Sequence, residues 1–391
     1  ASLPFFWNCL RGTFVLSLSC LVWLGLPGTK GNLSEACMWM EAKNQLYGTT
    51  NNAYDFSRTV GGSSGGDACT VSFCGAPVCL SSDVGGSIRI PAFFNGLFGH
   101  KPTGASVPNT FTHPTTHNKV QRFCQLGPIA RHAEDLMPLL RIVAGSDSYF
   151  KCEDYKWPDP SSVQIAGLTV LNIETISYGH FMVSRRDKAL VQAHKRVVQA
   201  LRDRGCRVVD VDWPEMYQAF DIWSAMMDNN KGAPFREIIS EGKSQIWVLW
   251  EMLKLFFGCS DHTFPALGLA LVERLTEAAP GKVAQLVAAG EKLKAKMSEE
   301  IGDGVLLYPS LPKSAPEHDF VFRTFDCSAT CIFNVMELPA TQVPLGLNEM
   351  GLPLGIQVVA NHGQDHKSIA VAIALQEAFG GWQPPLPPDT K

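Results

Sequence analysis

Two serines set in glycine-rich segments are the residues of this chain whose type and spacing could do chemistry. The first segment, GGSSGG at 61–66, holds Ser63 and Ser64, and the second, DVGGS at 83–87, ends at Ser87. A serine hydroxyl is a weak nucleophile until a base removes its proton, and the oxyanion of an attacked carbonyl needs converging N–H donors. Glycines leave such backbone donors uncovered. The pattern therefore favours Ser87 as a nucleophile and Ser63 as the group that passes its proton to a base.

Two other interpretations of the glycines are weaker. Glycine-rich loops also bind phosphate, but no lysine follows GGSSGG in the P-loop pattern, and no strand with dinucleotide-binding spacing precedes it. Residues 61–65 match the nucleophile elbow G-x-S-x-G, yet that elbow follows a buried strand, whereas residues 51–60 are polar and typical of turns. A reacting pair of serines uses both segments.

A much longer stretch carries a resemblance to a known family. GGSSGG, followed after a gap by SDVGGSIRIPAFFNGLFGHKPT, resembles the signature of the amidase signature family of serine hydrolases. GPIARHAEDLMPLLRIVAG, VLLYPSLP and TQVPLGLNEMGLPLGIQVVA are similar to the fatty-acid amide hydrolase branch, type 2, of that family. The similarity runs over roughly residues 31–383.

The resemblance implies a Ser–Ser–Lys catalytic unit. It assigns the nucleophile to Ser87 and the bridging serine to Ser63, after a cis peptide bond between Gly62 and Ser63. It assigns an oxyanion hole and a set of supporting residues, which are Val84, Gly85, Gly86 and Ser87 for the hole, and Ser64, Asp83 and Arg89 for support. It implies no metal and no organic cofactor.

The lysine of that unit has no counterpart in this sequence. In the family it lies further upstream of the bridging serine than the 62 residues that precede Ser63 here, and Lys30 and Lys101 match other, non-catalytic positions. Residues 12–26 form an apolar stretch that the family does not explain. We expect an apolar N-terminal segment at 1–30, either an anchor or an artefact, then an amidase signature domain at 31–391 whose activity is impaired without the lysine.

The remaining sequence predicts the elements that must position these serines. Residues 163–173 and 206–214 predict strands on either side of an amphipathic helix at 187–205, which is the pattern of a crossover unit in a parallel or mixed sheet. Two more strands at 339–347 and 352–360 precede a closing helix at 367–381. Together with the resemblance, these predict an α/β fold in which helices cover both faces of a mixed, twisted sheet.

One segment is far more apolar than its surroundings. Residues 245–258, QIWVLWEMLKLFFG, span about 21 Å as a helix, which is too short to cross a bilayer. An ordinary buried helix is the favoured interpretation. The alternative is a hairpin, continued through residue 271, that docks on a membrane or lines a channel and a cavity reaching Ser87.

Composition excludes several other classes of function. The net charge of −4 gives no basic surface for nucleic acid, and the 12 cysteines show neither a CxxC pair nor zinc-ligand spacing. The prediction is an amidase that cleaves fatty-acid amides, associates with an intracellular membrane and is compatible with a homodimer. The alternatives are an inactive relative that binds lipid or protein, and an amidase or amidotransferase acting on polar amides.

Overall fold

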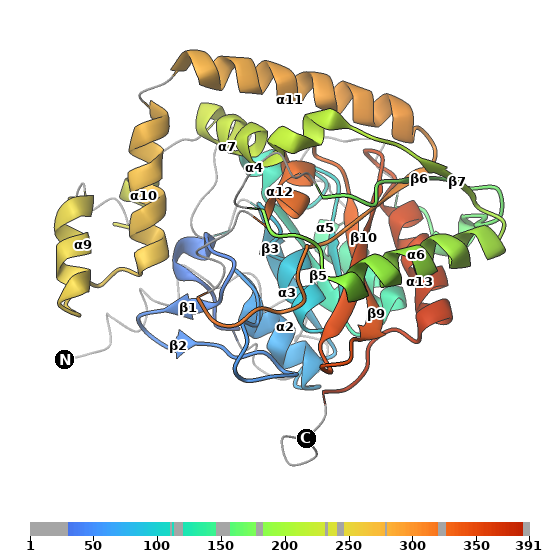
Figure 1. Ribbon diagram of the computed structural model, residues 1–391, viewed down its shortest axis with the longest axis horizontal. Coiled ribbons are helices and arrows are strands. Elements are labelled where there is room, and N and C mark those ends of the chain that lie inside the picture. The colour runs from blue at the N-terminus through green and yellow to red at the C-terminus, as the bar shows by residue number, and fades with distance from the viewer. Residues whose placement is uncertain are drawn as a thin grey trace.

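An eight-stranded mixed sheet forms the centre of the computed structural model, which describes residues 30–109, 112, 120–145, 157–176, 183–230, 234–240, 246–277, 280–319 and 326–385 (Figure 1). The strand order is β3-β5-β4-β9-β10-β8-β6-β7. The strands are β3 (Val78–Asp83), β4 (Phe98–Lys101), β5 (Gln125–Ala130), β6 (Thr169–Asn172), β7 (Arg207–Asp210), β8 (Val305–Tyr308), β9 (Ala340–Leu347) and β10 (Pro353–Ala360). Strand β6 pairs in parallel with β7 and β8, and the other neighbours are antiparallel.

Helices cover both faces of this sheet, as predicted. Successive side chains of strand β8 point to opposite faces of the sheet. Val305 and Leu307 belong to the apolar cluster on one face, and Leu306 and Tyr308 belong to the cluster on the other. The first cluster includes α5 (Leu136–Ala144), α6 (Lys188–Asp203) and α13 (Asp365–Phe379). The second includes α7 (Ala219–Asn230), α11 (Pro280–Ile301) and α12 (Ser328–Val335). The predicted fold class is confirmed.

The structure also confirms the predicted crossover unit and the predicted C-terminal strands and helix. The crossover unit is β6, α6 and β7, with a parallel pair, and the C-terminal strands are the antiparallel pair β9 and β10 followed by α13. The apolar stretch at 12–26 lies outside the described residues.

Short elements complete the description. They are β1 (Lys43–Asn44), β2 (Gly48–Thr49), α2 (Gly65–Ser72), α3 (Arg89–Phe94), α4 (Val120–Phe123), α8 (Phe235–Ile238), and the 3-10 helices η1 (Glu35–Cys37), η2 (Ala133–Asp135), η3 (Pro160–Ser162) and η4 (Pro214–Gln218). Helices α2 and α3 matter most for function because each begins directly after one of the serine segments.

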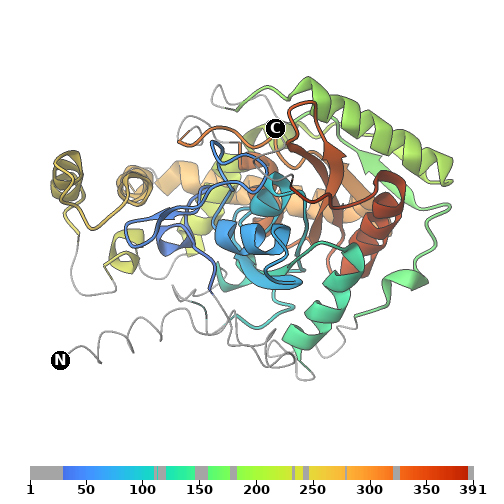
Figure 2. The same cartoon turned by 90° about the horizontal axis from the view of Figure 1, so that it is seen from below.

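The prediction of a buried helix at 245–258 is wrong. Helix α9 (Val248–Phe256) packs through Val248, Met252 and Leu255 on α10 (Phe264–Glu277), and the two helices project from the body of the molecule (Figures 1 and 2). The other side of α9 is uncovered, with Trp247 79% and Phe256 82% exposed. Both stripes of this helix are apolar, so its sequence could not show which one packs. Within the described residues, no helix is both long and apolar enough to span a membrane.

Candidate active site

The two serine segments meet at the starts of α2 and α3. The Ser64 amide donates to the Ser87 carbonyl oxygen at 3.4 Å, although 24 positions separate Ser63 from Ser87. The peptide bond between Gly62 and Ser63 is cis, as the resemblance implied. Residues 39–42 close the far side of this loop, because a Cβ on Gly62 would lie 2.5 Å from the Trp39 carbonyl oxygen. Backbone packing of this closeness explains the glycine before Ser63.

The two hydroxyls are buried but do not bond to each other. The Ser63 side chain is fully buried and its Oγ has no hydrogen-bond partner among the described residues, while Ser87 is 8% exposed. Direct proton transfer from Ser87 to Ser63 requires their hydroxyls to come within hydrogen-bonding distance, and the structure shows no such bond. An orphaned polar atom costs free energy in a protein interior, and such atoms often mark a site that awaits a partner.

The four predicted oxyanion donors are not equivalent. The Gly86 N–H donates to the Asp83 carboxylate at 2.7 Å, so this amide is already engaged. The amides of Val84, Gly85 and Ser87 make no hydrogen bond to any residue that the structure describes. Three of the four predicted donors therefore remain available for a carbonyl oxygen, and Gly86 has a bracing role instead.

Asp83 and Arg89 form the buried brace of this loop. The Asp83 carboxylate accepts the N–H groups of Gly86 and Ile88 and both Nε and Nη2 of Arg89, with the last two distances at 3.0 Å. Burial on its own would raise the pKa of Asp83, but the Arg89 charge and its hydrogen bonds outweigh it and hold the pKa at about 2. The carboxylate stays charged, and its hydrogen bonds fix the turn before Ser87.

No basic group of the described residues bonds to Ser63. Lys30 is exposed. Lys101 is fully buried and its pKa is lowered to about 7 by burial and by the Arg89 charge, but its Nζ donates to the Pro102 carbonyl oxygen at 2.8 Å. The Cys37 thiol lies beside Ser63, and burial raises its pKa to about 11, so it stays protonated near neutral pH.

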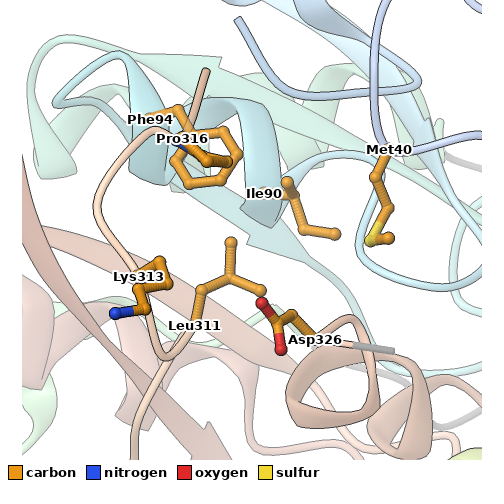
Figure 3. Close-up of a pocket in the computed structure, with 7 residues that line it drawn as sticks. All are labelled: Met40, Ile90, Phe94, Leu311, Lys313, Pro316 and Asp326. Atoms are coloured by element: carbon orange, nitrogen blue, oxygen red, sulfur yellow. The ribbon is translucent and has the colours of Figure 1, made fainter. Parts of the chain in front are cut away.

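A small apolar cavity lies beside α3, and one of its lining residues, Ile90, is three positions after Ser87 in the sequence. Its lining residues are Met40, Ile90, Phe94, Leu311, Lys313, Pro316 and Asp326 (Figure 3). No residue of 245–271 lines this cavity, and α9 and α10 lie to one side of the molecule (Figure 2), so the alternative in which they line a cavity reaching Ser87 finds no support in it. Among the described side chains, no cluster of His, Cys, Asp and Glu could hold a metal ion.

Four contacts of the site come from residues that sequence reasoning missed. Asn334 and Gln357 bond to the Arg89 guanidinium, at 2.7 and 3.1 Å. Trp223 and Thr330 bond to the carbonyl oxygens of Val84 and Gly85. All four lie more than 130 positions after Ser87, and no local pattern distinguishes them, so the sequence alone offers no signal that connects them to it.

The fold and the paired serine loops define a class of hydrolase, and comparison with known proteins agrees. A family model described as Amidase matches residues 25–369, and this chain belongs to that family. It is 41% identical to fatty-acid amide hydrolase 2-A of Danio rerio and 38% identical to fatty-acid amide hydrolase 2 of Homo sapiens, in each case over 90% of this chain. The chain spans 66% of the length of each of these relatives.

Solved structures show the same fold at lower identity. A glutamyl-tRNA(Gln) amidotransferase chain of Thermotoga maritima matches 92% of this chain and 76% of its own length, with a TM-score of 0.70 and 23% identity. A 6-aminohexanoate cyclic dimer hydrolase matches 90% of this chain and 75% of its own length, with a TM-score of 0.69, also at 23% identity.

Proposed function

We propose that this protein is a serine hydrolase that cleaves fatty-acid amides to a fatty acid and an amine. The contact between the Ser64 amide and the Ser87 carbonyl carries the proposal, because it brings the buried Ser63 hydroxyl to the loop of Ser87. Free amides of Val84, Gly85 and Ser87 lie on that loop. Hydroxyls and backbone donors in this arrangement are what acyl transfer requires.

The reaction proceeds through an acyl-enzyme. The Ser87 Oγ attacks the amide carbonyl carbon, and the free amides stabilise the oxyanion. Ser63 passes the proton of Ser87 toward the leaving nitrogen, the C–N bond breaks and the amine departs. Water then adds to the ester on Ser87, which releases the fatty acid and returns the proton to the serine. Burial of Ser63 excludes bulk water from the proton path.

The 391-residue chain turns amides over slowly in this proposal. The support is the Ser63 hydroxyl, which has no hydrogen-bond partner among the described residues, and the Lys101 amine, which bonds elsewhere. The resemblance implies that a lysine supplied by an upstream segment activates Ser63. Among the described residues, no lysine amine bonds to Ser63 to act as the general base for attack by Ser87.

The substrate class is supported by two observations. The relatives at 38% and 41% identity are named fatty-acid amide hydrolases. The exposed side of α9 presents Trp247, Leu249, Trp250, Phe256 and Phe257, which suits a helix that lies in a membrane interface, where an apolar substrate is dissolved. We therefore propose peripheral association with an intracellular membrane.

The direct test is hydrolysis of oleamide, followed as release of oleic acid. We compare the chain alone with a chain joined to the upstream part of the Danio rerio relative. Slow turnover by the first, faster turnover by the second, and no turnover after Ser87→Ala support the proposal. Binding of oleamide without turnover by the joined protein favours the inactive relative instead. Hydrolysis of glutamine or asparagine amides but not oleamide favours a polar-amide enzyme.

A further inference from the structure

The carbonyl oxygens of Val84, Gly85 and Gly86 all accept hydrogen bonds, whereas the amides of Gly85 and Ser87 make none with the described residues. In a trans peptide unit, the C=O of one residue and the N–H of the next point in opposite directions. A hydrogen bond to a carbonyl therefore also sets the direction of the following amide. Three peptide units join Val84 to Ser87.

Each of these three peptide units has a hydrogen-bonded carbonyl. The indole Nε1 of Trp223 donates to the Val84 oxygen at 2.9 Å, which turns the Gly85 N–H the other way. The hydroxyl of Thr330 donates to the Gly85 oxygen at 2.7 Å, while the Gly86 N–H on the opposite side bonds Asp83. The Ile90 N–H donates to the Gly86 oxygen at 2.7 Å and turns the Ser87 N–H away from α3.

Two of these donors come from distant helices that pack together. Trp223 lies on α7 and Thr330 on α12, which contact each other above one face of the sheet (Figure 1). The Trp223 ring also lies against Gly85, since a Cβ there would be 3.4 Å from its Cζ2. A Cβ on Gly86, which has a φ of 123°, would meet the Thr330 hydroxyl at 2.2 Å. The Thr330 contact therefore requires glycine at position 86, whereas the Trp223 ring packs on Gly85 at an ordinary van der Waals distance.

We propose that Trp223 and Thr330 are positioning residues that hold the Val84–Gly85 and Gly85–Gly86 peptide units, so that the Gly85 amide faces the oxyanion formed during attack by Ser87. The inference rests on the proposed function and adds two residues to it. Neither side chain needs to contact the substrate. Oxyanion donors stabilise a transition state because they are fixed in advance, so a loop free to rotate its peptide units loses part of that stabilisation.

The test uses the 391-residue chain and two readouts that a merely structural role does not move. The first is binding of octylboronic acid, which adds to a serine oxygen as a tetrahedral anion and is seen by ¹¹B NMR. The second is hydrolysis of a p-nitrophenyl ester, whose leaving group needs no protonation. Loss of an aimed donor weakens boronate binding and lowers kcat by about tenfold, with little change in KM.

Four variants separate positioning from stability. Trp223→Phe and Thr330→Val each remove one donor, and Thr330→Ser keeps the hydroxyl and restores both readouts. Trp213→Phe is the matched control, because its indole also loses a hydrogen bond, to Glu300 at 2.7 Å, away from the loop. It is expected to change melting temperature but neither readout.

The outcomes distinguish the inference from the proposed function. If Ser87→Ala abolishes the tetrahedral boronate and Trp223→Phe weakens it tenfold, both stand. If Ser87→Ala abolishes it but Trp223→Phe and Thr330→Val leave both readouts at the level of Trp213→Phe, the inference is overturned and the proposed function survives. If the unmodified chain forms no tetrahedral adduct, the role of Ser87 fails and the inference falls with it.

Discussion

Asp83 and Arg89 are opposite charges that water does not reach, and each depends on the other. The guanidinium also donates to the Thr330 carbonyl, Asn334 and Gln357, so every edge of it is satisfied. A fully buried pair is a weak source of net stability, but removal of one partner leaves a bare charge in the interior. The two residues differ from surface ion pairs in that respect.

Asp83→Asn is therefore expected to destabilise the protein by about 3–5 kcal/mol, because it leaves Arg89 uncompensated. The measurement is urea unfolding followed by circular dichroism. Asp303→Asn is the control, since the Asp303 side chain is 97% exposed and its pair with Lys367 lies in solvent, where ion pairs contribute little. Equal costs for the two substitutions would contradict the bracing role of Asp83.

The same carboxylate sets an acid limit for the loop. The pKa of Asp83 is held at about 2, below its value of about 4 in an unfolded chain. Its contribution to stability is complete above the unfolded pKa and is lost as pH falls through the folded pKa. Acid unfolding monitored between about pH 5 and pH 1.5 should show this loss in the parent protein and not in Asp83→Asn. A parallel profile for both proteins would exclude Asp83 as its source.

At the scale of elements, the turn between α9 and α10 is hydrogen-bonded to Glu35, which precedes the serine segments in the sequence. The Glu35 carboxylate accepts from His262 Nδ1 and the Thr263 N–H, both at 2.7 Å. The hydrogen bond to Glu35 raises the pKa of His262 against the effect of burial, with help from the charges of Glu251 and Asp261. Burial opposes the change at Glu35, whose bonds nevertheless lower its pKa.

This pair is fully charged between the lowered pKa of Glu35 and the raised pKa of His262. A histidine whose pKa is raised by folding contributes stability that is complete below its unfolded pKa and is lost as pH rises through the folded one. His262→Gln should cost about 1 kcal/mol at about pH 6 and less at about pH 8.5 in urea unfolding. A cost that is the same at both values would show that His262 is neutral throughout.

The exposed side of α9 gives an element-scale prediction about membranes. Trp250→Ser with Phe256→Ser should weaken binding to phosphatidylcholine vesicles by about tenfold or more, because two large apolar side chains no longer enter the interface. Met350→Ser is the control, since Met350 is 61% exposed on the turn between β9 and β10. Unchanged sedimentation with vesicles, together with loss of a dimer in ultracentrifugation, would assign this surface to a second copy of the chain.

At the scale of the whole molecule, the sequence predicted what local patterns encode. Apolar runs and the crossover pattern identified β6, α6, β7, β9, β10 and α13. Helix α6 buries one regular stripe, and β10 is a mostly apolar run that is buried along its whole length. The motif identified both serine loops, and the structure brings them together. The sequence could not show which side of α9 is exposed, because both of its stripes are apolar. It could not show that Trp223 and Thr330 reach the Val84–Ser87 loop, because those contacts join residues more than 130 positions apart.

The central claim is that Ser87 is the nucleophile and that Ser63 assists it. The most direct measurement is reaction of the chain with a long-chain alkyl fluorophosphonate, followed by mass spectrometry of the intact protein and its peptides. The account predicts one adduct per chain, located on Ser87, absent in Ser87→Ala and formed more slowly in Ser63→Ala. An adduct on Ser63 or Ser64, or equal labelling of Ser87→Ala, would contradict it.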